Sequence, residues 1–155
     1  MDYLNMNKEA LLPVVKELNV LLSDYNLYYQ KLRNFHWNIK GHNFFDLHNK
    51  FEEMYNDAKL KVDAIAERIL TLNFHPISRF SDYLSMSSLE ESESLISDEK
   101  MVEILLNDHS ILLEQMKKTI DLANKAEDEG TIDLIGAYMR ELEKDSWMLN
   151  AWLNK

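Results

Sequence analysis

The sequence predicts an all-α protein that folds as a four-helix bundle. The chain of 155 residues contains only 3 Gly and 2 Pro, and 46% of its residues are hydrophobic, a composition typical of long helices. Four long segments carry apolar residues at three- and four-residue spacing, and residues 77–97, rich in serine and acids, separate the second from the third. We expect residues 1–155 to form a single domain with short tails at both ends.

The first two segments predict a helical hairpin. The first helix is expected over 8–38 or 13–38, because Pro13 suits a first turn, and Gly41 supplies the stop. The second helix is expected over about 43–72, before a proline-containing break. Their apolar faces include Leu18, Leu21, Leu22, Tyr25, Tyr28, Tyr29, Leu32 and Phe35 in the first, and Phe51, Tyr55, Val62, Ile65, Ile69 and Leu72 in the second.

Residues 77–97 predict a long connection with one short helix around Phe80, Tyr83 and Leu84. The alternative is a flexible linker between two domains. We reject it, because each half alone would be a two-helix hairpin with too small a core to be stable.

The third and fourth long helices complete the bundle. Ser97 is the expected N-cap of the third, with Asp98 and Glu99 in its first turn. We expect this helix to stop near Gly130 and Thr131 to cap the fourth. Four long helices with one long crossover in the middle define the ferritin-like topology.

Composition excludes several classes of function. The chain has no cysteine, which excludes disulfides, thiolate metal sites and cysteine nucleophiles and fits a reducing compartment. No secretory signal and no apolar stretch of membrane-spanning length are found, so we expect a cytoplasmic protein. The formal net charge of −10 predicts a surface that repels nucleic acid and anionic lipid and attracts cations.

An acidic pair marks the second helix. Asp63 and Glu67 stand four residues apart, which places their side chains about 6 Å apart on one helix face, and carboxylate oxygens are hard metal ligands. The alternative is a solvated acidic face with Lys59 and Arg68 nearby.

Three of the five histidines lie around Gly41. In an antiparallel hairpin that turns there, His36 and His48 lie at similar depth at the same end. Each could be a packed core ring or a metal ligand. His42 lies in the turn itself, where capping or exposure is expected.

One chain cannot bring these two groups together. His48 and Asp63 are about 22 Å apart along one helix, yet they share a face. Two copies of this helix, packed antiparallel across a two-fold axis near Tyr55 and Asn56, would bring His48 of one chain to Asp63 of the other. The candidate metal site is therefore expected at a subunit interface.

The segment "HWNIKGHNFFDLHNKFEEMY…VDAIAER" closely resembles the signature of the Dps family, the DNA-binding proteins from starved cells, also called miniferritins. The resemblance covers nearly the whole chain, including the short helix of the crossover and the Trp147-Met148 pattern. It implies a hollow dodecamer that oxidises Fe(II), preferentially with hydrogen peroxide, and stores the ferric product. Zinc is a substitute that these ligands would also accept.

The resemblance also implies roles for individual residues. The ferroxidase centre takes His36 and His48 from one subunit and Asp63 and Glu67 from its two-fold mate. Further roles are implied for Glu52, which would help hold a second, weaker iron where many members carry Asp, and for Trp37, the aromatic residue flanking the centre. The Glu-x-x-His pairs of bundle-core di-iron sites are absent from the sequence.

Acids between the third and fourth helices resemble those that line pores at three-fold axes in the family. Iron would enter there, although a solvated acidic turn is the alternative. The residues are Glu127, Asp128, Glu129 and Asp133, of which Asp133 matches best.

The alternative function is compaction of DNA as a nucleoid structural protein. Members that bind DNA usually do so through lysine-rich tails. Here the first tail, MDYLNMN, has one acid and no base. We therefore expect neither direct DNA binding nor nucleoid association, whereas removal of iron and peroxide would still protect DNA from oxidative damage.

Overall fold

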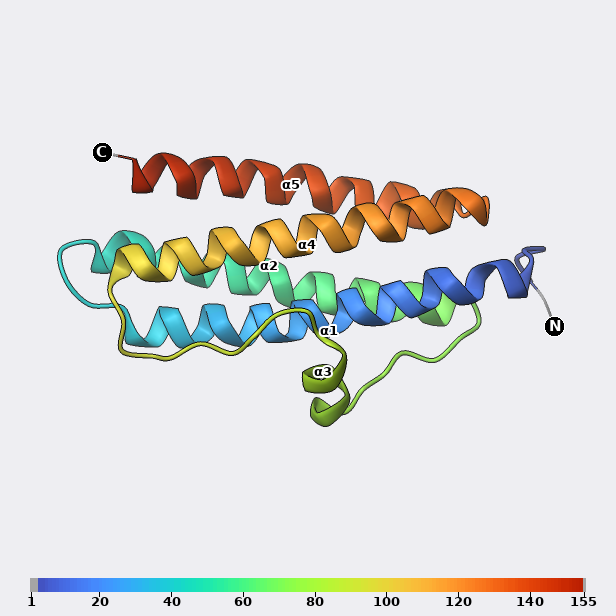
Figure 1. The fold of residues 1–155 in the computed structure, drawn as a ribbon, viewed down its shortest axis with the longest axis horizontal. Helices are drawn as coiled ribbons and strands as arrows, with labels where there is room; N and C mark the ends of the chain where they lie inside the picture. Colours follow the sequence, from blue (N-terminus) through green and yellow to red (C-terminus); the bar gives the residue numbers. More distant parts are fainter. Residues whose placement is uncertain (1–2, 155) are drawn as a thin grey trace.

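Four long helices pack side by side in the computed structural model, which describes residues 3–154 (Figure 1). Helices α1 (Lys8–Asn38) and α2 (Phe44–Thr71) form one hairpin, and α4 (Asp98–Lys125) and α5 (Glu129–Leu153) form the other. The crossover runs back along the outside of α1 and carries α3 (Phe80–Met86). The predicted four-helix bundle with a short helix in the long connection is confirmed.

Helix α1 begins at the earlier of the two predicted positions. The side chain of Asn7 accepts the backbone N–H groups of Glu9 and Ala10, at 3.0 and 3.2 Å, and so caps the helix. Pro13 consequently lies inside the helix, about one turn from its start, rather than at the first position.

The predicted boundary between the last two helices is wrong. Helix α4 ends at Lys125, before Gly130, and Asp128 rather than Thr131 is the N-cap of α5. The Asp128 carboxylate accepts the backbone N–H of Thr131 at 3.1 Å. Gly130 therefore belongs to the first turn of α5. It does not end α4.

The crossover is attached to α1 by polar contacts. The buried carboxylate of Asp24 accepts the Ser87 hydroxyl at 2.8 Å and the Ser88 backbone N–H at 2.7 Å. Asn34 donates to the Ser92 carbonyl at 3.1 Å. These contacts speak against the flexible-linker alternative.

A continuous apolar core fills the bundle and receives side chains from all four long helices. Its largest fully buried members include Tyr25, Phe35, Phe51, Ile65, Ile69, Met101 and Leu105. Among residues 3–154, no helix is long and apolar enough to cross a membrane.

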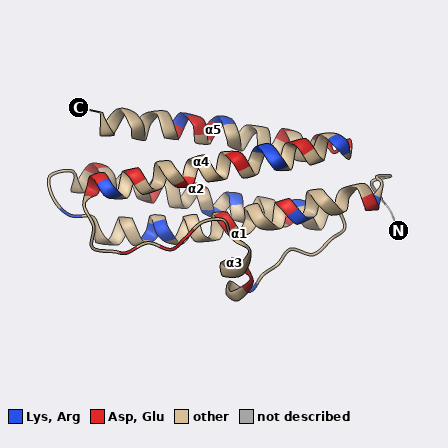
Figure 2. Ribbon diagram, in the orientation of Figure 1, with Lys and Arg blue, Asp and Glu red and all other residues tan. Residues whose placement is uncertain are grey.

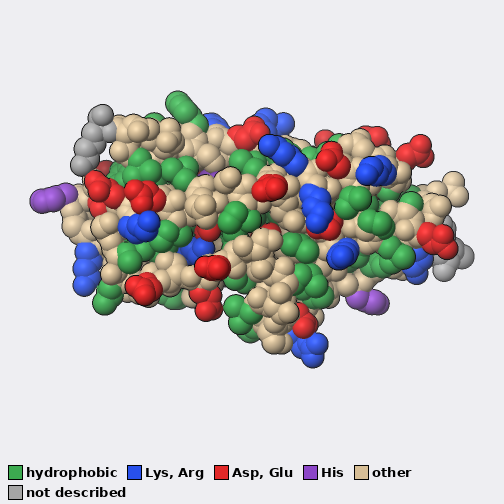
Figure 3. All heavy atoms as spheres, in the orientation of Figure 1, with side chains coloured by type: hydrophobic (Ala, Val, Ile, Leu, Met, Phe, Trp, Pro, Cys, Tyr) green, Lys and Arg blue, Asp and Glu red, His purple; other side chains and the backbone are tan. Residues whose placement is uncertain are grey.

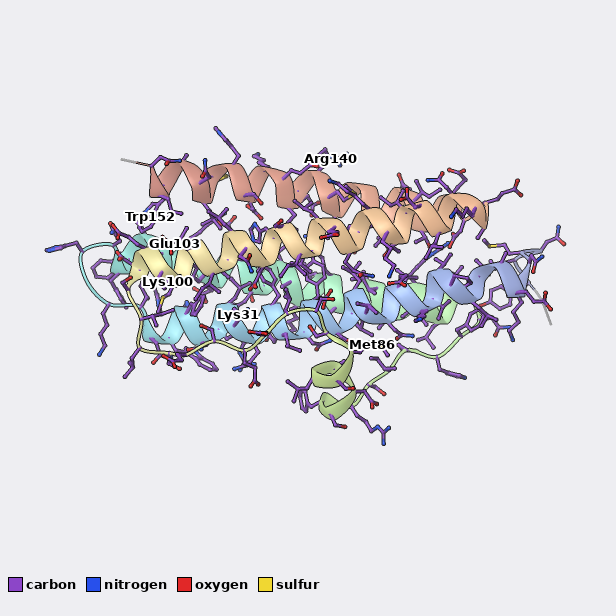
Figure 4. All side chains as sticks on the ribbon, viewed as in Figure 1. Lys31, Met86, Lys100, Glu103, Arg140 and Trp152 are labelled. Carbon is purple, nitrogen blue, oxygen red and sulfur yellow. The ribbon has the colours of Figure 1, made fainter. Side chains whose placement is uncertain are left out.

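One ion pair is buried within this core. Lys31 of α1, labelled in Figure 4, reaches Asp108 of α4 at 2.7 Å, and both side chains are only 4% exposed. Burial raises the pKa of Asp108, although the contact with Lys31 opposes that shift. The pair helps fix the contact between α1 and α4, since either charge alone would be strongly disfavoured there.

Candidate metal centre

His36 and His48 form a reciprocal pair where α1 turns into α2. Their rings stack with centroids 3.8 Å apart and an interplanar angle of 16°. The Nδ1 of each ring lies 2.7 Å from the backbone carbonyl oxygen of the other residue. A carbonyl oxygen only accepts hydrogen bonds, so each Nδ1 must carry a hydrogen. The predicted meeting of the two histidines at one depth is confirmed.

This pairing sets the tautomer of both rings. With Nδ1 protonated, the neutral imidazole has its lone pair on Nε2, and neither Nε2 has a hydrogen-bond partner among residues 3–154. Metal-binding histidines commonly donate their other ring N–H to a backbone carbonyl, which orients the ring. In both His36 and His48 the Nε2 lone pair is therefore available to a metal ion, as the prediction of metal ligands requires.

The local sequence explains how the two rings meet. His36 lies in the last turn of α1, where carbonyl groups lack helical partners and are free to accept from His48. Gly41 turns the chain at a φ of 101°, a conformation that favours glycine. Two aromatic side chains extend the stack: Phe44 lies 4.8 Å from His48, and Tyr55 lies 5.2 Å from His36, both measured between ring centroids.

Asp63 and Glu67 are exposed on α2. Neither carboxylate makes a hydrogen bond or ion pair with a described residue. Lys59 likewise makes no ion pair with a described residue, and Arg68 is directed to Asp128 instead. The two carboxylates therefore form an exposed acidic face without a basic partner in the described part of the chain, so the alternative of a solvated acidic face stays open beside that of a pair of metal ligands.

A single chain does not assemble the predicted ligand set. Within residues 3–154, no group of three or more His, Asp or Glu side chains is close enough to hold a metal ion. The histidine pair and the carboxylate pair lie on one long helical hairpin at separate positions, as the spacing of His48 and Asp63 requires.

The two remaining residues predicted near the centre are both exposed. Glu52 lies one turn after His48, and the Tyr55 hydroxyl is 3.5 Å from its carboxylate. Trp37 is 57% exposed and lies under the Arg33 guanidinium, 4.8 Å from the ring centroid. Its ring is not part of the histidine stack. His42 is exposed in the turn, as expected.

The acidic corner between α4 and α5 contains two kinds of carboxylate. Glu127, Glu129 and Asp133 are exposed, whereas Asp128 is fully buried. Arg68 lies 2.5 Å from the Asp128 carboxylate. Asp128 is thus engaged in capping and ion pairing, a role that sequence reasoning missed because Arg68 and Asp128 are 60 residues apart.

A second histidine network, also missed, occupies the bundle interior. The Tyr28 hydroxyl lies 2.6 Å from Nε2 of His109, whose Nδ1 lies 2.7 Å from the Ser146 hydroxyl. Ser146 donates its hydrogen to the Leu142 carbonyl, so His109 donates from Nδ1 and accepts Tyr28 at Nε2. Burial lowers the pKa of His109 to about 3, with a smaller contribution from Lys50, and keeps the ring neutral.

Known proteins share this fold and much of this sequence. Residues 15–155 match the ferritin-like domain family. A Dps protein from Vibrio cholerae O1, described as a member of a broad superfamily of ferritin-like diiron-carboxylate proteins, superposes with a TM-score of 0.96 at 42% identity, covering 99% of this chain and 97% of that one. Dps from Staphylococcus aureus superposes with a TM-score of 0.89 at 39% identity, covering 92% and 95%.

A curated relative agrees with these structures. DNA protection during starvation protein 2 of Bacillus anthracis is 41% identical over 150 residues, which cover 97% of this chain and 100% of that protein. The fold and these likenesses define a ferritin-like protein of the diiron-carboxylate superfamily. Within that class the chain belongs to the Dps family, and the family predicted from the segment around Gly41 is confirmed.

Proposed function

We propose that this protein oxidises Fe(II) at centres shared between two subunits and stores the ferric product inside a hollow shell. The observation on which we base this proposal is the reciprocal His36–His48 pair, which leaves two Nε2 atoms without hydrogen-bond partners among the described residues. Asp63 and Glu67, exposed on the same helix as His48, supply the complementary carboxylates. Mixed imidazole and carboxylate ligands suit non-haem Fe(II), and they would also accept zinc.

Two Fe(II) ions held together give a balanced reaction with hydrogen peroxide. Each Fe(II) gives up one electron, and one peroxide with two protons becomes two water molecules, leaving two Fe(III). A single Fe(II) would release hydroxyl radical instead. His36, His48, Asp63 and Glu67 would hold the first ion, and Glu52 would help hold the second. Iron is thus the substrate as well as the stored product, and the protein would act as a ferroxidase.

Shared centres require association of subunits. Antiparallel contact of two α2 helices around Tyr55 brings His48 of each chain to Asp63 of the other, and the two-fold axis generates two equal sites. We propose a dodecamer, the assembly implied by the resemblance to the Dps family. Iron would enter at three-fold axes past Glu127, Glu129 and Asp133, which are exposed. The buried Asp128 instead caps α5 and pairs with Arg68. The cytoplasmic location stays a prediction.

Direct DNA compaction is the second candidate function, and the Bacillus anthracis relative is named for DNA protection during starvation. Charge and structure oppose it here. The net charge is −10, and basic side chains on the face in Figure 3 are interspersed with acidic ones; Figure 2 shows the same mixture along the helices. Tyr3, before α1, contacts the bundle, because its hydroxyl donates to the Thr71 carbonyl at 2.8 Å. We propose that DNA protection follows from removal of iron and peroxide.

A gel-shift measurement tests this negative proposal. At neutral pH, moderate salt and without added iron or magnesium, the assembled protein should not retard duplex DNA, because phosphate contacts by Lys and Arg dominate such binding. A gel shift that disappears as salt is raised would contradict the proposal and would favour DNA compaction as the function.

Mixing two damaged subunits tests the shared centre. One variant is His36→Ala/His48→Ala and the other is Asp63→Ala/Glu67→Ala, and each alone should oxidise Fe(II) slowly. When they are refolded together, random pairing makes about half of the dimers mixed, and each mixed dimer regains one complete site of two, so about a quarter of wild-type activity should return. Ferric absorbance after adding Fe(II) and peroxide without air provides the measurement.

Co-purification through an affinity tag carried by only one of the two variants must first verify that the two variants assemble together. Sites built within one chain would recover nothing, since every chain carries a lesion. Given verified co-assembly, absence of recovery would rule out the interface centre, and a stable monomer of the wild-type chain at micromolar concentration would do the same.

A further inference from the structure

Arg68 connects the carboxylate-bearing end of α2 to the corner between α4 and α5, seen at the right-hand end of the bundle in Figure 1. Its terminal nitrogen lies 2.5 Å from Asp128 Oδ1, and its Nε donates to Thr131 Oγ1 at 3.0 Å. The Thr131 hydroxyl donates to Asp128 Oδ2 at 2.5 Å. Arg68, Asp128 and Thr131 therefore form a closed ring of hydrogen bonds, which we call the Arg68 clamp.

Gly130 leaves the space that this clamp needs. A Cβ atom at position 130 would lie 2.6 Å from one terminal nitrogen of Arg68 and 2.9 Å from the guanidinium carbon. Real Cβ atoms essentially never approach other atoms this closely, so the guanidinium, which is the far end of a flexible side chain, would have to shift. By contrast, a Cβ at Gly136, one and a half turns further along α5, would meet nothing within 4 Å. Gly130 is thus matched to the guanidinium, and Gly136 is a control at a neighbouring position.

Within residues 3–154, the clamp is one of three cation bridges from α2 to α5 or its N-cap. It differs from the other two because its acid, Asp128, is fully buried, whereas Asp145 and Glu141 are partly exposed. Arg68 is also the bridging residue nearest to Glu67 along α2, directly after it in the sequence, whereas Lys61 is nearer to Asp63. The three bridges are Lys50–Asp145 at 3.3 Å, Lys61–Glu141 at 2.7 Å and Arg68–Asp128 at 2.5 Å.

We propose that Arg68, with Gly130 leaving room for it, positions Glu67 for metal binding. Successive residues of a helix point about 100° apart, so holding Arg68 toward α5 directs Glu67 away from it and toward solvent. Glu67 has no side-chain partner of its own among the described residues, and its orientation therefore depends on how α2 is held. This role rests on the proposed function, because it matters only if Glu67 is a metal ligand.

Zinc titration of the assembled protein tests this role without relying on activity. Arg68→Ala and Gly130→Ala should each weaken Zn(II) binding about tenfold in calorimetry, the usual effect of losing a residue that orients a metal ligand. Gly136→Ala should leave the affinity unchanged. Alanine is also the better helix former, so weaker binding in Gly130→Ala could not come from helix propensity.

The double variant Arg68→Ala/Gly130→Ala provides the decisive comparison. Once the guanidinium is gone, alanine at 130 has nothing to displace, and the double variant should bind Zn(II) no more weakly than Arg68→Ala alone. Additive losses would show that Gly130 acts by another route and would overturn the clamp. Wild-type zinc affinity in Arg68→Ala, with only the unfolding midpoint lowered, would reduce Arg68 to a stabilising contact.

Two further variants keep the outcomes separable. If Arg68→Ala does not assemble, Asp128→Asn retains an N-cap acceptor but removes the charge that holds Arg68, and it should weaken zinc binding similarly. His36→Ala/His48→Ala serves as the reference for the proposed centre. If this reference binds Zn(II) as tightly as wild type, the proposed function fails, whereas a failure confined to Arg68 and Gly130 overturns only the positioning role.

Discussion

Two histidine environments in this bundle differ in one respect that separates a candidate ligand from a structural ring. His36 and His48 use only Nδ1 in hydrogen bonds, and their Nε2 atoms have no partner among residues 3–154. His109 uses both nitrogens, one toward Tyr28 and one toward Ser146. Burial alone does not distinguish them, because His36 is only 8% exposed and His109 is 1% exposed. The two environments are distinguished by whether a ring nitrogen lacks a hydrogen-bond partner.

The difference comes from the groups that surround each ring. His36 and His48 face backbone carbonyls, which can satisfy only the protonated nitrogen. His109 faces two hydroxyl groups, and a hydroxyl can donate to one ring nitrogen or accept from the other. The interior network is therefore complete within the chain, whereas each ring of the pair at the α1–α2 turn keeps an Nε2 lone pair that is available to a hydrogen-bond donor or a metal ion.

The same substitution at both places should separate them most clearly. In His48→Gln the amide can replace the Nδ1 hydrogen bond but offers an oxygen in place of the imidazole that Fe(II) favours. The initial rate of Fe(II) oxidation by peroxide should fall on the order of 100-fold, the upper end of what even supporting residues of metal sites produce. Ferric absorbance at equal shell concentration provides the measurement.

His109→Gln is the matched control for that experiment. Its amide can accept from Tyr28 and donate to Ser146, so the interior network remains satisfied. The rate of Fe(II) oxidation should stay within about twofold of wild type, as expected for a change that touches no ligand. An equal loss of oxidation rate in both variants would mean that His109 takes part in the chemistry. It would contradict the proposed distinction between histidines with a free ring nitrogen and those with both nitrogens hydrogen-bonded.

Two glycines show why sequence predicted one turn and missed the other. Gly41 ends a helix because its φ of 101° disfavours any side chain, and nothing lies within 4 Å of a Cβ built there. Gly130 lies inside a helix because Arg68, distant in sequence, occupies the space of a Cβ. The sequence alone does not show whether a glycine is needed for a positive φ or for the space that a Cβ would fill. The hairpin was therefore predicted closely, as 43–72 against Phe44–Thr71 for α2, while the α4–α5 corner was misplaced.

In the candidate site, too, some features could be predicted from the sequence and others could not. Spacing along helices predicted that His36 and His48 would meet, because a hairpin with a short turn leaves little freedom in depth. It could not predict the reciprocal hydrogen bonds, which depend on how closely α1 approaches α2. Nor could it predict that Asp128 is buried by Arg68, since a contact between residues 60 apart depends on the packing of the whole bundle. Local periodicity determines position along a helix, and tertiary packing determines the partner.

A smaller effect, on stability, follows from the occupied nitrogens of His109. Unfolded histidine has a pKa near 6.5, and burial lowers the pKa of His109 to about 3. Between these values the unfolded chain binds the proton more strongly, so stability is fully present above about pH 6.5 and is lost as the pH falls toward 3. From pH 6.5 to 5 the loss from His109 should be about 2 kcal/mol per subunit.

Asp24 and Asp108 oppose this trend, because burial raises their pKa values and makes the folded chain the stronger proton binder there. Both acids remain in His109→Gln, so the difference between wild type and this variant isolates the histidine. Urea unfolding at pH 6.5 and pH 5 should show wild type losing about 2 kcal/mol more than His109→Gln over this interval. Parallel pH dependence in the two proteins would mean that His109 is protonated in the folded chain as readily as in the unfolded one. Its nitrogens would then be as available as those of His36 and His48, and the proposed distinction between the two environments would not hold.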